Sequence, residues 1–178
     1  MPLILDIGCG KHKTKGAIGI DIVKLPEVDI VMNIENKKLP FKNNTIDEIH
    51  CYHTLEHVAN LSFVLDEFWR VLKEGGRLYI KVPHFSFFGN YADPTHKRSF
   101  SYFTFDFFTG EAGENISYYY KFKFKIIKRK LHFHKNIFAK VLIFPLDVLA
   151  NTFPKFYERY ITRIYTPTEI EVIMVAQK

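Results

Sequence analysis

The feature that most constrains the fold is a short apolar run that ends in a glycine turn. Leu3–Ile7 is that run, and Gly8-Cys9-Gly10 follows it at once. An apolar run of this length is typical of a strand buried on both faces of a parallel sheet. Glycines let the backbone turn and approach a ligand closely, and open α/β sheets bind ligands at the carboxyl ends of their strands. The sequence therefore predicts a ligand site directly after its first strand.

A second predicted strand, Ala17–Ile22, carries Asp21 near its end. A carboxylate there can accept hydrogen bonds from both hydroxyls of a ribose. A dinucleotide site needs Gly-x-Gly-x-x-Gly opening a helix, but Lys13 occupies the third glycine position. Residues 11–16 are also too few for a phosphate-binding helix before the second strand. The pattern favours a nucleoside ligand over a dinucleotide.

The rest of the chain alternates strand-like and helix-like segments, which is typical of an α/β protein. Apolar residues at helical spacing predict an amphipathic helix at Asn60–Lys73, with Asn60 as its N-cap and Gly75-Gly76 after its end. Phe103–Phe108 is predicted to be a short helix. Further strands are predicted at Val28–Met32, Ile46–Cys51, Arg77–Val82, Tyr118–His134 and Glu169–Ala176.

The expected fold class is therefore α/β, with a Rossmann-like, mostly parallel twisted sheet of about seven strands. The last strands, which lack crossover helices, should form an antiparallel pair at one edge. A full helix between the first two strands should be missing. We expect one domain over residues 1–178, with a helical insertion at residues 135–160 before the last strand.

Four sequence blocks in this order resemble the class I S-adenosylmethionine-dependent methyltransferases, in particular the small methyltransferase-type-11-like group. Together they cover about half of the chain, and it is their combination that is specific. The blocks are Leu3–Gly10, Gly19–Ile22, Leu39-Pro40-Phe41 with Ile46–Val58, and Arg70–Leu78.

This resemblance implies S-adenosylmethionine as cofactor and assigns residues to it. Asp6, Gly8, Cys9 and Gly10 would line its methionine and ribose part, and Asp21 with Ile22 would hold the ribose. Asn33 stands where the family often has an acidic residue that contacts the adenine amine; its side-chain oxygen can accept the same hydrogen bond. The remaining predicted contacts are the backbone N–H of Ile34 to the adenine ring and His53 at the methionine end.

Polar residues gather after the fifth predicted strand, where the transferred methyl group would lie. The segment Asp93-Pro-Thr-His-Lys-Arg98 offers His96 and Asp93 to remove a proton from the acceptor and Arg98 to bind an anionic group. His84 and His57 are further catalytic candidates. The alternative is that Asp93–His96 is a turn whose side chains bond its own backbone.

His132 and His134 alternate on one strand face, where two metal ligands could point together. A third ligand is not evident, so no metal is predicted. The formal charge of +6 and the pI of about 9.2 permit an anionic acceptor, nucleic acid or peripheral membrane contact. Two isolated cysteines fit a reduced, cytoplasmic compartment. The apolar segment Ile137–Phe153 is too interrupted to span a bilayer and suits packing on the sheet or a homodimer.

The sequence thus predicts a methyltransferase acting on a small-molecule or glycan/lipid-linked acceptor. An RNA or protein methyltransferase is the rival enzyme, although an Asn-Pro-Pro-Tyr-like base-flipping motif is missing from Cys51–Thr54. A non-catalytic module that binds S-adenosylmethionine or a partner protein is the rival from another class, because the cover over the cofactor looks trimmed.

Overall fold

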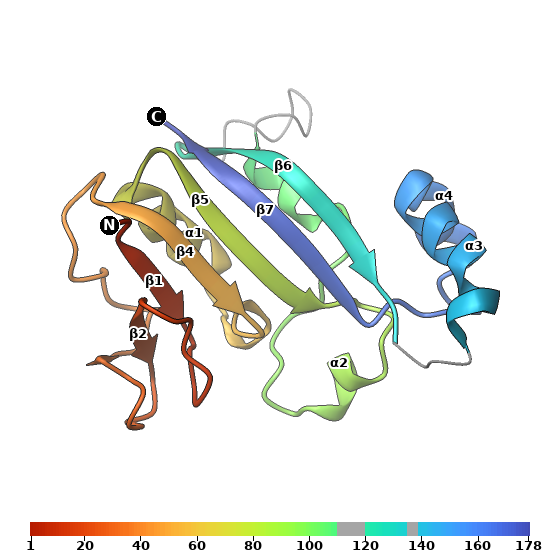
Figure 1. Cartoon of the computed structure of the whole chain (residues 1–178), viewed down its shortest axis with the longest axis horizontal. Coiled ribbons are helices and arrows are strands. Elements are labelled where there is room, and N and C mark those ends of the chain that lie inside the picture. The colour runs from red at the N-terminus through yellow and green to blue at the C-terminus, as the bar shows by residue number, and fades with distance from the viewer. Residues whose placement is uncertain (110–119, 135–138) are drawn as a thin grey trace.

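The computed structural model describes residues 1–109, 120–134 and 139–178 and contains a seven-stranded mixed sheet (Figure 1). The strand order is β3-β2-β1-β4-β5-β7-β6, so the expected mostly parallel sheet with an antiparallel edge pair is confirmed. The strands are β1 (Ile4–Ile7), β2 (Ile18–Asp21), β3 (Ile30–Val31), β4 (Ile46–Tyr52), β5 (Leu72–Pro83), β6 (Lys123–His132) and β7 (Glu169–Gln177).

Parallel pairing of the first strands brings their carboxyl ends to one edge of the sheet. Ile7, the last residue of β1, lies opposite Ile20 in β2 and Cys51 in β4. Figure 1 shows the arrowheads of β1, β4 and β5 pointing to the same side, where the short helix α2 (Gly89–Ala92) lies. The connection from β1 to β2 consists of turns without a helix, as the sequence predicted.

The boundary between α1 (Leu61–Val71) and β5 differs from the prediction. Asn60 caps the helix by accepting a hydrogen bond from the backbone N–H of Phe63, but the helix ends two residues before Lys73. Leu72 already lies opposite Ile46 and is fully buried. The helix therefore ends where Leu72 pairs with β4, before Gly75, at which the sequence predicted the end of the helix.

On the antiparallel side, β7 lies between β5 and β6. The predicted long strand at residues 118–134 is shorter in the structure, and residues 118–119 lie outside the described part. Phe124 faces the core while Lys123 and Lys125 are exposed, as the alternation predicted. The register shifts between Ile126 and Lys128, and this bulge restores an inward position at Leu131.

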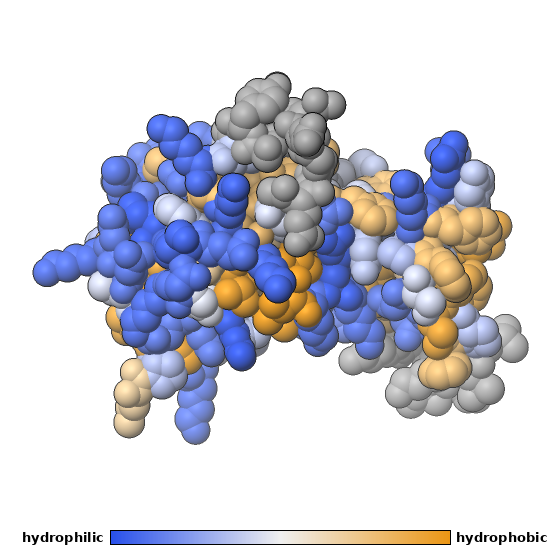
Figure 2. All heavy atoms as spheres, turned by 90° about the horizontal axis from the view of Figure 1, so that it is seen from above, coloured by the Kyte–Doolittle hydropathy of each residue, from blue (hydrophilic) through white to orange (hydrophobic). Residues whose placement is uncertain are grey.

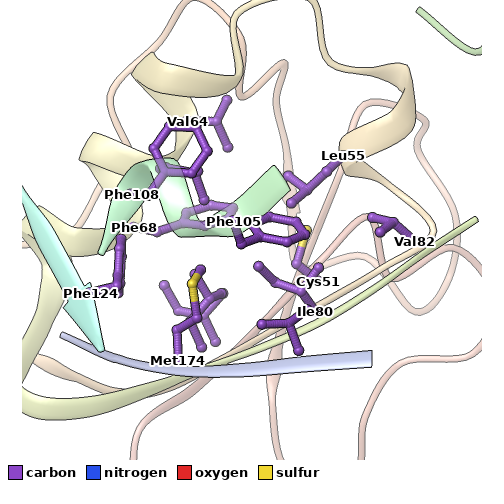
Figure 3. Close-up of a cluster of buried hydrophobic side chains, with 14 of the residues drawn as sticks. Cys51, Leu55, Val64, Phe68, Ile80, Val82, Phe105, Phe108, Phe124 and Met174 are labelled. Carbon is purple, nitrogen blue, oxygen red and sulfur yellow. The ribbon is translucent and has the colours of Figure 1, made fainter. Parts of the chain in front are cut away.

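One face of the sheet carries the hydrophobic core. The helix α1 and the 3₁₀ helix η2 (Thr104–Phe108) pack on it, and Figure 3 shows Phe68 and Phe105 from these helices above Ile80 and Met174 of the sheet. All four side chains are fully buried. Burial of such side chains contributes about 1.5–3 kcal/mol each relative to exposure, which fixes the strands that lead to the site.

The opposite face of the central strands is polar. In β4, Glu48, His50 and Tyr52 alternate with the buried residues Ile49 and Cys51. In Figure 1 no helix of the described part lies over this face. Because antiparallel and mixed sheets can expose one polar face to water, the polar alternation explains how the sheet tolerates the missing helix between β1 and β2.

Residues 139–160 contain two helices, α3 (Ala139–Thr152) and α4 (Pro154–Tyr160). Residues 135–138 of the expected insertion lie outside the described part. Pro154 starts α4, whereas Pro145 lies inside α3 and does not break it. The Asn151 side chain exchanges hydrogen bonds with the backbone of Leu131, at 2.8 and 3.2 Å, which holds α3 on the edge strand β6. No helix of the described part is long and apolar enough to cross a membrane.

Candidate functional site

A pocket opens at the carboxyl ends of the parallel strands. It draws on the ends of β1, β2 and β4, on the segment after β3 and on the 3₁₀ helix η1 (Leu55–His57). Six of the nine residues predicted to contact the cofactor line it. The full lining is Ile7, Gly8, Ile20, Asp21, Ile22, Met32, Asn33, Ile34, Glu35, His53, Thr54, His57 and Val58.

Gly8 makes the turn that opens the pocket. Its φ of 70° is in the left-handed region, and its N–H donates to the carbonyl of Ile20 at 2.7 Å. A Cβ at this position would lie 2.0 Å from Oγ1 of Thr54. The close approach of β1 to the end of β4 therefore requires glycine here.

Asp21 is fixed by two backbone donors. Gly10 N–H donates to Oδ2 at 3.0 Å, and Val23 N–H donates to Oδ1 at 2.9 Å. A carboxylate has about four lone-pair sites, so both oxygens retain acceptor capacity toward the pocket. The glycine turn and the acidic strand end thus form one hydrogen-bonded unit that suits a ribose diol.

Asp6, Cys9 and Gly10, which were also predicted to contact the cofactor, do not line the pocket. Asp6 is buried, and its Oδ2 accepts the backbone N–H of Thr14 at 2.6 Å. Burial, with the charge of Asp6 beside it, raises the pKa of the Cys9 thiol. Asp6 thus stabilises the backbone of the loop to which Cys9 and Gly10 belong.

The segment after β3 forms the apolar side of the pocket. Oδ1 of Asn33 accepts the N–H of Glu35 at 2.9 Å, which shapes the turn that places Ile34 beside Met32 in the pocket wall. Together with Ile22, these aliphatic side chains provide flat contacts for an aromatic base. Because Oδ1 of Asn33 already accepts one hydrogen bond, only its second lone pair is available to an adenine amine.

Glu35 was missed by the sequence analysis, although it lines the pocket. Its carboxylate accepts the N–H of Ala59 and pairs with Nζ of Lys97 at 3.1 Å. The bond from Ala59, followed by that from Lys97, lowers the pKa of Glu35 despite partial burial. Lys97 lies 62 residues away, so nothing local in the sequence indicates the pair.

His53 carries a positive charge into the pocket. It has a φ of 50°, and its Nε2 contacts Oε2 of Glu169 at 2.8 Å. The hydrogen bond that the ring donates to Glu169, followed by the one it donates to Glu56, raises the pKa of His53 to about 9. The ring is half exposed, with 53% of its side chain accessible, so its charge can act on a ligand. Glu169 is 116 residues distant and was missed.

The catalytic candidates His57, His96 and Asp93 lie together at the pocket's edge. The rings of His57 and His96 are 4.8 Å apart in a T-shaped arrangement, and Nε2 of His96 lies 3.8 Å from Oδ2 of Asp93. Asp93 also accepts the N–H and hydroxyl of Thr95. Asp93–His96 therefore forms the turn that the sequence offered as the alternative. The same turn joins the histidine cluster, because Thr95 Oγ1 contacts Nδ1 of His57 at 2.9 Å. The hydrogen bonds that Thr95 donates, from its hydroxyl and then from its N–H, lower the pKa of Asp93.

Two predicted site residues have other contacts. The ring of His84 is completely buried; its Nε2 contacts Glu158 at 2.9 Å and its Nδ1 contacts the Ser86 hydroxyl at 2.8 Å. It does not line the pocket, and these buried contacts suit a structural role better than the predicted catalytic one. Arg98 donates to the carbonyls of Val58 and Ala59 at 2.7 and 2.5 Å. Its guanidinium holds the loop on η1 instead of pointing at an anionic ligand.

Comparison with known proteins adds a family to this geometry. Residues 5–80 match the family model of a methyltransferase domain. An uncharacterized protein of Methanocaldococcus jannaschii is 40% identical over 93 residues, which cover 45% of this chain. The aligned part spans 40% of that protein's length, so most of the relative has no counterpart in the match.

Solved structures share the fold along nearly the whole chain. A S-adenosylmethionine-dependent methyltransferase from Archaeoglobus fulgidus is similar with a TM-score of 0.60 and 20% identity, over 98% of this chain and 86% of that one. The complex of the Haloferax volcanii Trm112 methyltransferase activator with a putative methyltransferase gives a TM-score of 0.60 and 17% identity, over 99% and 83%. At these identities the two likenesses establish the fold.

Residues 5–80 thus match a methyltransferase domain, and the fold is the one that solved S-adenosylmethionine-dependent methyltransferases share, as the sequence blocks indicated. The cofactor of this class is S-adenosylmethionine, and the pocket fits it. Asp21 has acceptors free for a diol, Gly8 leaves no side chain over the turn, and Ile22, Met32 and Ile34 form an apolar wall.

Proposed function

We propose that this protein is a S-adenosylmethionine-dependent methyltransferase that modifies a hydroxyl of a small-molecule or glycan/lipid-linked acceptor. One observation carries the proposal. His57 lines the cofactor pocket and also contacts the polar cluster of His96 and Thr95. The groups that would hold the cofactor and those that would receive the acceptor thus share one wall.

In the proposed complex, Asp21 binds the ribose hydroxyls and the apolar wall of Ile22, Met32 and Ile34 contacts the adenine. The methionine end extends past Gly8 toward His53, whose positive charge favours the cofactor's carboxylate. When bound, S-adenosylmethionine supplies an electrophilic methyl group on a sulfonium. The protein then has to align the acceptor, exclude water and take up its proton.

The cluster of His57, His96 and Asp93 is suited to the last task. Both imidazoles are held in place through their Nδ1 atoms, by Thr95 and by the carbonyl of Asn90. The side chain of His96 is only 10% exposed, so an acceptor group beside it would be largely shielded from water. Neutral imidazoles fixed in this way can bind an acceptor hydroxyl and accept its proton.

An apolar surface lies away from the pocket, at the end of the molecule opposite β1 and β2 (Figure 1). Figure 2 shows hydrophobic side chains gathered at the end of the molecule that α3 and α4 form. Phe153, Phe156 and Tyr160 are exposed there, next to Lys155 and Arg159. Apolar side chains rimmed by cations suit contact with a lipid surface that carries the acceptor; a second copy of the chain would use the same surface.

Calorimetry with S-adenosylmethionine and with its demethylated product tests the cofactor site. Both should bind the wild-type chain, and Asp21→Ala should weaken both by about 10- to 150-fold, since a hydrogen bond to a charged group contributes about 1.5–3 kcal/mol. Asp47→Ala is the matched control. That carboxylate also accepts a backbone N–H, from Leu3 at 2.7 Å, but lies outside the pocket. Unchanged binding in Asp21→Ala would refute the assignment.

Release of the demethylated cofactor on an acceptor panel tests the reaction. Hydroxyl-bearing glycans and lipid-linked glycans should support turnover, and His96→Ala should reduce the rate while cofactor affinity stays within a few-fold. Turnover on RNA or protein alone would replace the proposed acceptor class. Tight cofactor binding without turnover, unaffected by His96→Ala, would make the protein a non-catalytic binding module.

A further inference from the structure

Three potential metal ligands converge beside the cofactor pocket. Glu56 and His57 come from η1, and His96 comes from the loop after α2. One carboxylate oxygen of Glu56 and one ring nitrogen of each histidine all lie within 4.8 Å of one another. The two segments are 39 residues apart in the sequence, so the fold itself assembles this group.

Glu56 is the unusual member of the cluster. Its residue is only 1% exposed, and its Oε2 is buried without a hydrogen-bond partner in the described part of the chain. The other oxygen, Oε1, lies 3.5 Å from Nδ1 of His53. A buried carboxylate oxygen without a partner is costly, and a bound cation would supply the missing interaction.

The hydrogen bonds of His57 leave Nε2 as its lone-pair donor. The Thr95 hydroxyl has one proton, which it donates to Oδ1 of Asp93 at 2.6 Å. Its oxygen can therefore only accept from Nδ1 of His57, 2.9 Å away. In the neutral ring the proton then sits on Nδ1, and Nε2 is free to bind a metal.

His96 has the same arrangement through a different partner. Its Nδ1 lies 2.9 Å from the backbone carbonyl of Asn90, which can only accept, so Nδ1 carries the proton. Metal-binding histidines almost always donate their second ring N–H to a carbonyl, a carboxylate or water. Both histidines of the cluster therefore have the tautomer and the outer contacts that metal ligation requires.

The backbone holds the two ligand-bearing segments together. The amides of Lys97 and Arg98 donate to the carbonyl of Glu56 at 2.8 and 3.3 Å. The guanidinium of Arg98 adds bonds to Val58 and Ala59. The position of His96 relative to η1 is therefore fixed before any ligand binds, which lowers the cost of assembling a site.

We propose that Glu56, His57 and His96 bind a divalent transition-metal ion of the Zn²⁺ type at the acceptor side of the cofactor pocket. Two histidines and one carboxylate are a known ligand set for catalytic Zn²⁺, which keeps one position open. Ligand atoms around a tetrahedral ion are about 3.4 Å apart for bonds of about 2.1 Å. The ligand atoms lie within 4.8 Å of one another, so binding needs a contraction of up to about 1.4 Å, which side-chain rotation can provide.

The role of this ion rests on the proposed function. An acceptor hydroxyl would take the open position, where the ion, in place of the imidazoles, lowers its pKa and lets its proton pass to solvent. The acceptor oxygen then attacks the methyl carbon: a carbon–oxygen bond forms, the sulfur–methyl bond breaks, and its electron pair stays on sulfur. The ion undergoes no redox change, so no further reactant is needed.

Titration of the chelator-treated, full-length chain with ZnCl₂ alone tests the proposal by calorimetry. We expect one site of micromolar or tighter affinity, weakened about 100-fold or more in His57→Ala and in His96→Ala. His132→Ala is the matched control, because His132 pairs with Glu171 at 2.8 Å outside the cluster. Absence of binding, or equal binding in all variants, would overturn the metal site.

Cobalt provides a second readout that does not depend on activity. Co²⁺ bound by two histidines and a carboxylate should give the visible bands of a four-coordinate ion, and Glu56→Gln should remove or shift them. Folding of each variant is checked by its urea midpoint; if Glu56→Gln does not fold, the two histidine variants decide. A spectrum of hexaaquo Co²⁺ in the folded wild type would also overturn the site.

Parallel titration with S-adenosylmethionine separates this proposal from the proposed function. Cofactor binding without Zn²⁺ binding refutes the metal site and leaves the methyltransferase assignment in place. Zn²⁺ binding without cofactor binding supports the metal site and refutes the assignment. When both bind, loss of turnover after chelation and its recovery with Zn²⁺ are the expected results.

Discussion

A side chain at Gly8 would collide with Thr54: its Cβ would lie 2.0 Å from the threonine Oγ1. The same hydroxyl donates to the carbonyl of Ile7 at 3.1 Å, so it cannot move away freely. Gly8→Ala should therefore lower both the free energy of unfolding and the affinity for S-adenosylmethionine, measured by urea titration and calorimetry. The loss in stability should be about 2–5 kcal/mol, from backbone strain and overpacking together.

Gly10→Ala separates the two contributions. Gly10 also has a positive φ, 49°, but a Cβ there would meet nothing within 4 Å. It should cost only the backbone strain of about 1–2 kcal/mol. Adding Thr54→Ala to Gly8→Ala should recover part of the loss. Equal destabilisation by Gly8→Ala and Gly10→Ala would contradict the steric explanation.

Arg98 is expected to act by positioning the loop that carries His96. Without its bonds to Val58 and Ala59, the loop should open more often. In Arg98→Ala, hydrogen exchange at the amides of Lys97 and residue 98, which donate to the Glu56 carbonyl, should be at least about 10-fold faster, since each 1.4 kcal/mol is a factor of ten. Cofactor affinity should change only a few-fold.

Arg163→Ala is the control for that experiment. Arg163 is exposed, and its substitution removes the same charge from another part of the surface. It should leave exchange at residues 97 and 98 unchanged. If the two variants exchange at the same rate, Arg98 does not hold the loop, and the original prediction of an anion-binding role would regain support.

The cofactor side of the site was largely predictable because its determinants are local. Gly8 and Asp21 lie 13 residues apart, and one short loop joins the two strands that carry them. The strand ends are placed by parallel pairing, which apolar runs indicate reliably. The finer division was not predictable: Asp6 and Cys9 are buried and do not line the pocket, and the sequence pattern does not distinguish lining residues from supporting ones.

The acceptor side was less predictable because long-range contacts decide it. In the sequence His96 is the first catalytic candidate and His84 a further one, but Glu158 in α4 pairs with His84 in the interior. The partnership of Glu56 with His96 depends on the path of the loop after α2, which the turn residues do not specify. The acceptor side was hard to predict because the residues that meet there are far apart in the sequence, not because their side-chain chemistry is ambiguous.

The contrast between His84 and His57 is testable. His84 is buried and bonded to Glu158 and Ser86, so His84→Ala should destabilise the fold by about 2–4 kcal/mol, through a lost charged hydrogen bond and a cavity. Cofactor affinity should stay within two-fold. His57→Ala should show the reverse pattern: cofactor affinity should fall, and the free energy of unfolding measured in urea should change little. A large loss of cofactor binding in His84→Ala, without unfolding, would restore it to the site.

The pH dependence of stability should report the pair of Glu67 and Arg70. Burial alone would raise the pKa of Glu67, but bonds from Arg70 and from the N–H of Leu39 outweigh it, and the pKa is lowered. In the unfolded chain Glu titrates at about 4.3. The pair's contribution to stability is therefore complete above that pH and is lost as the pH falls through the lower folded value.

Glu67→Gln should accordingly cost about 1.5–3 kcal/mol at pH 7, and the difference from wild type should shrink as the pH falls below about 4.3. Urea titrations at a series of pH values measure both quantities. Asp66→Asn is the control, because Asp66 is exposed on the same helix and should change stability by less than about 0.5 kcal/mol. A penalty for Glu67→Gln that stays constant with pH would contradict this prediction. It would show that packing, not the charge on Glu67, stabilises the contact between α1 and the segment before β4.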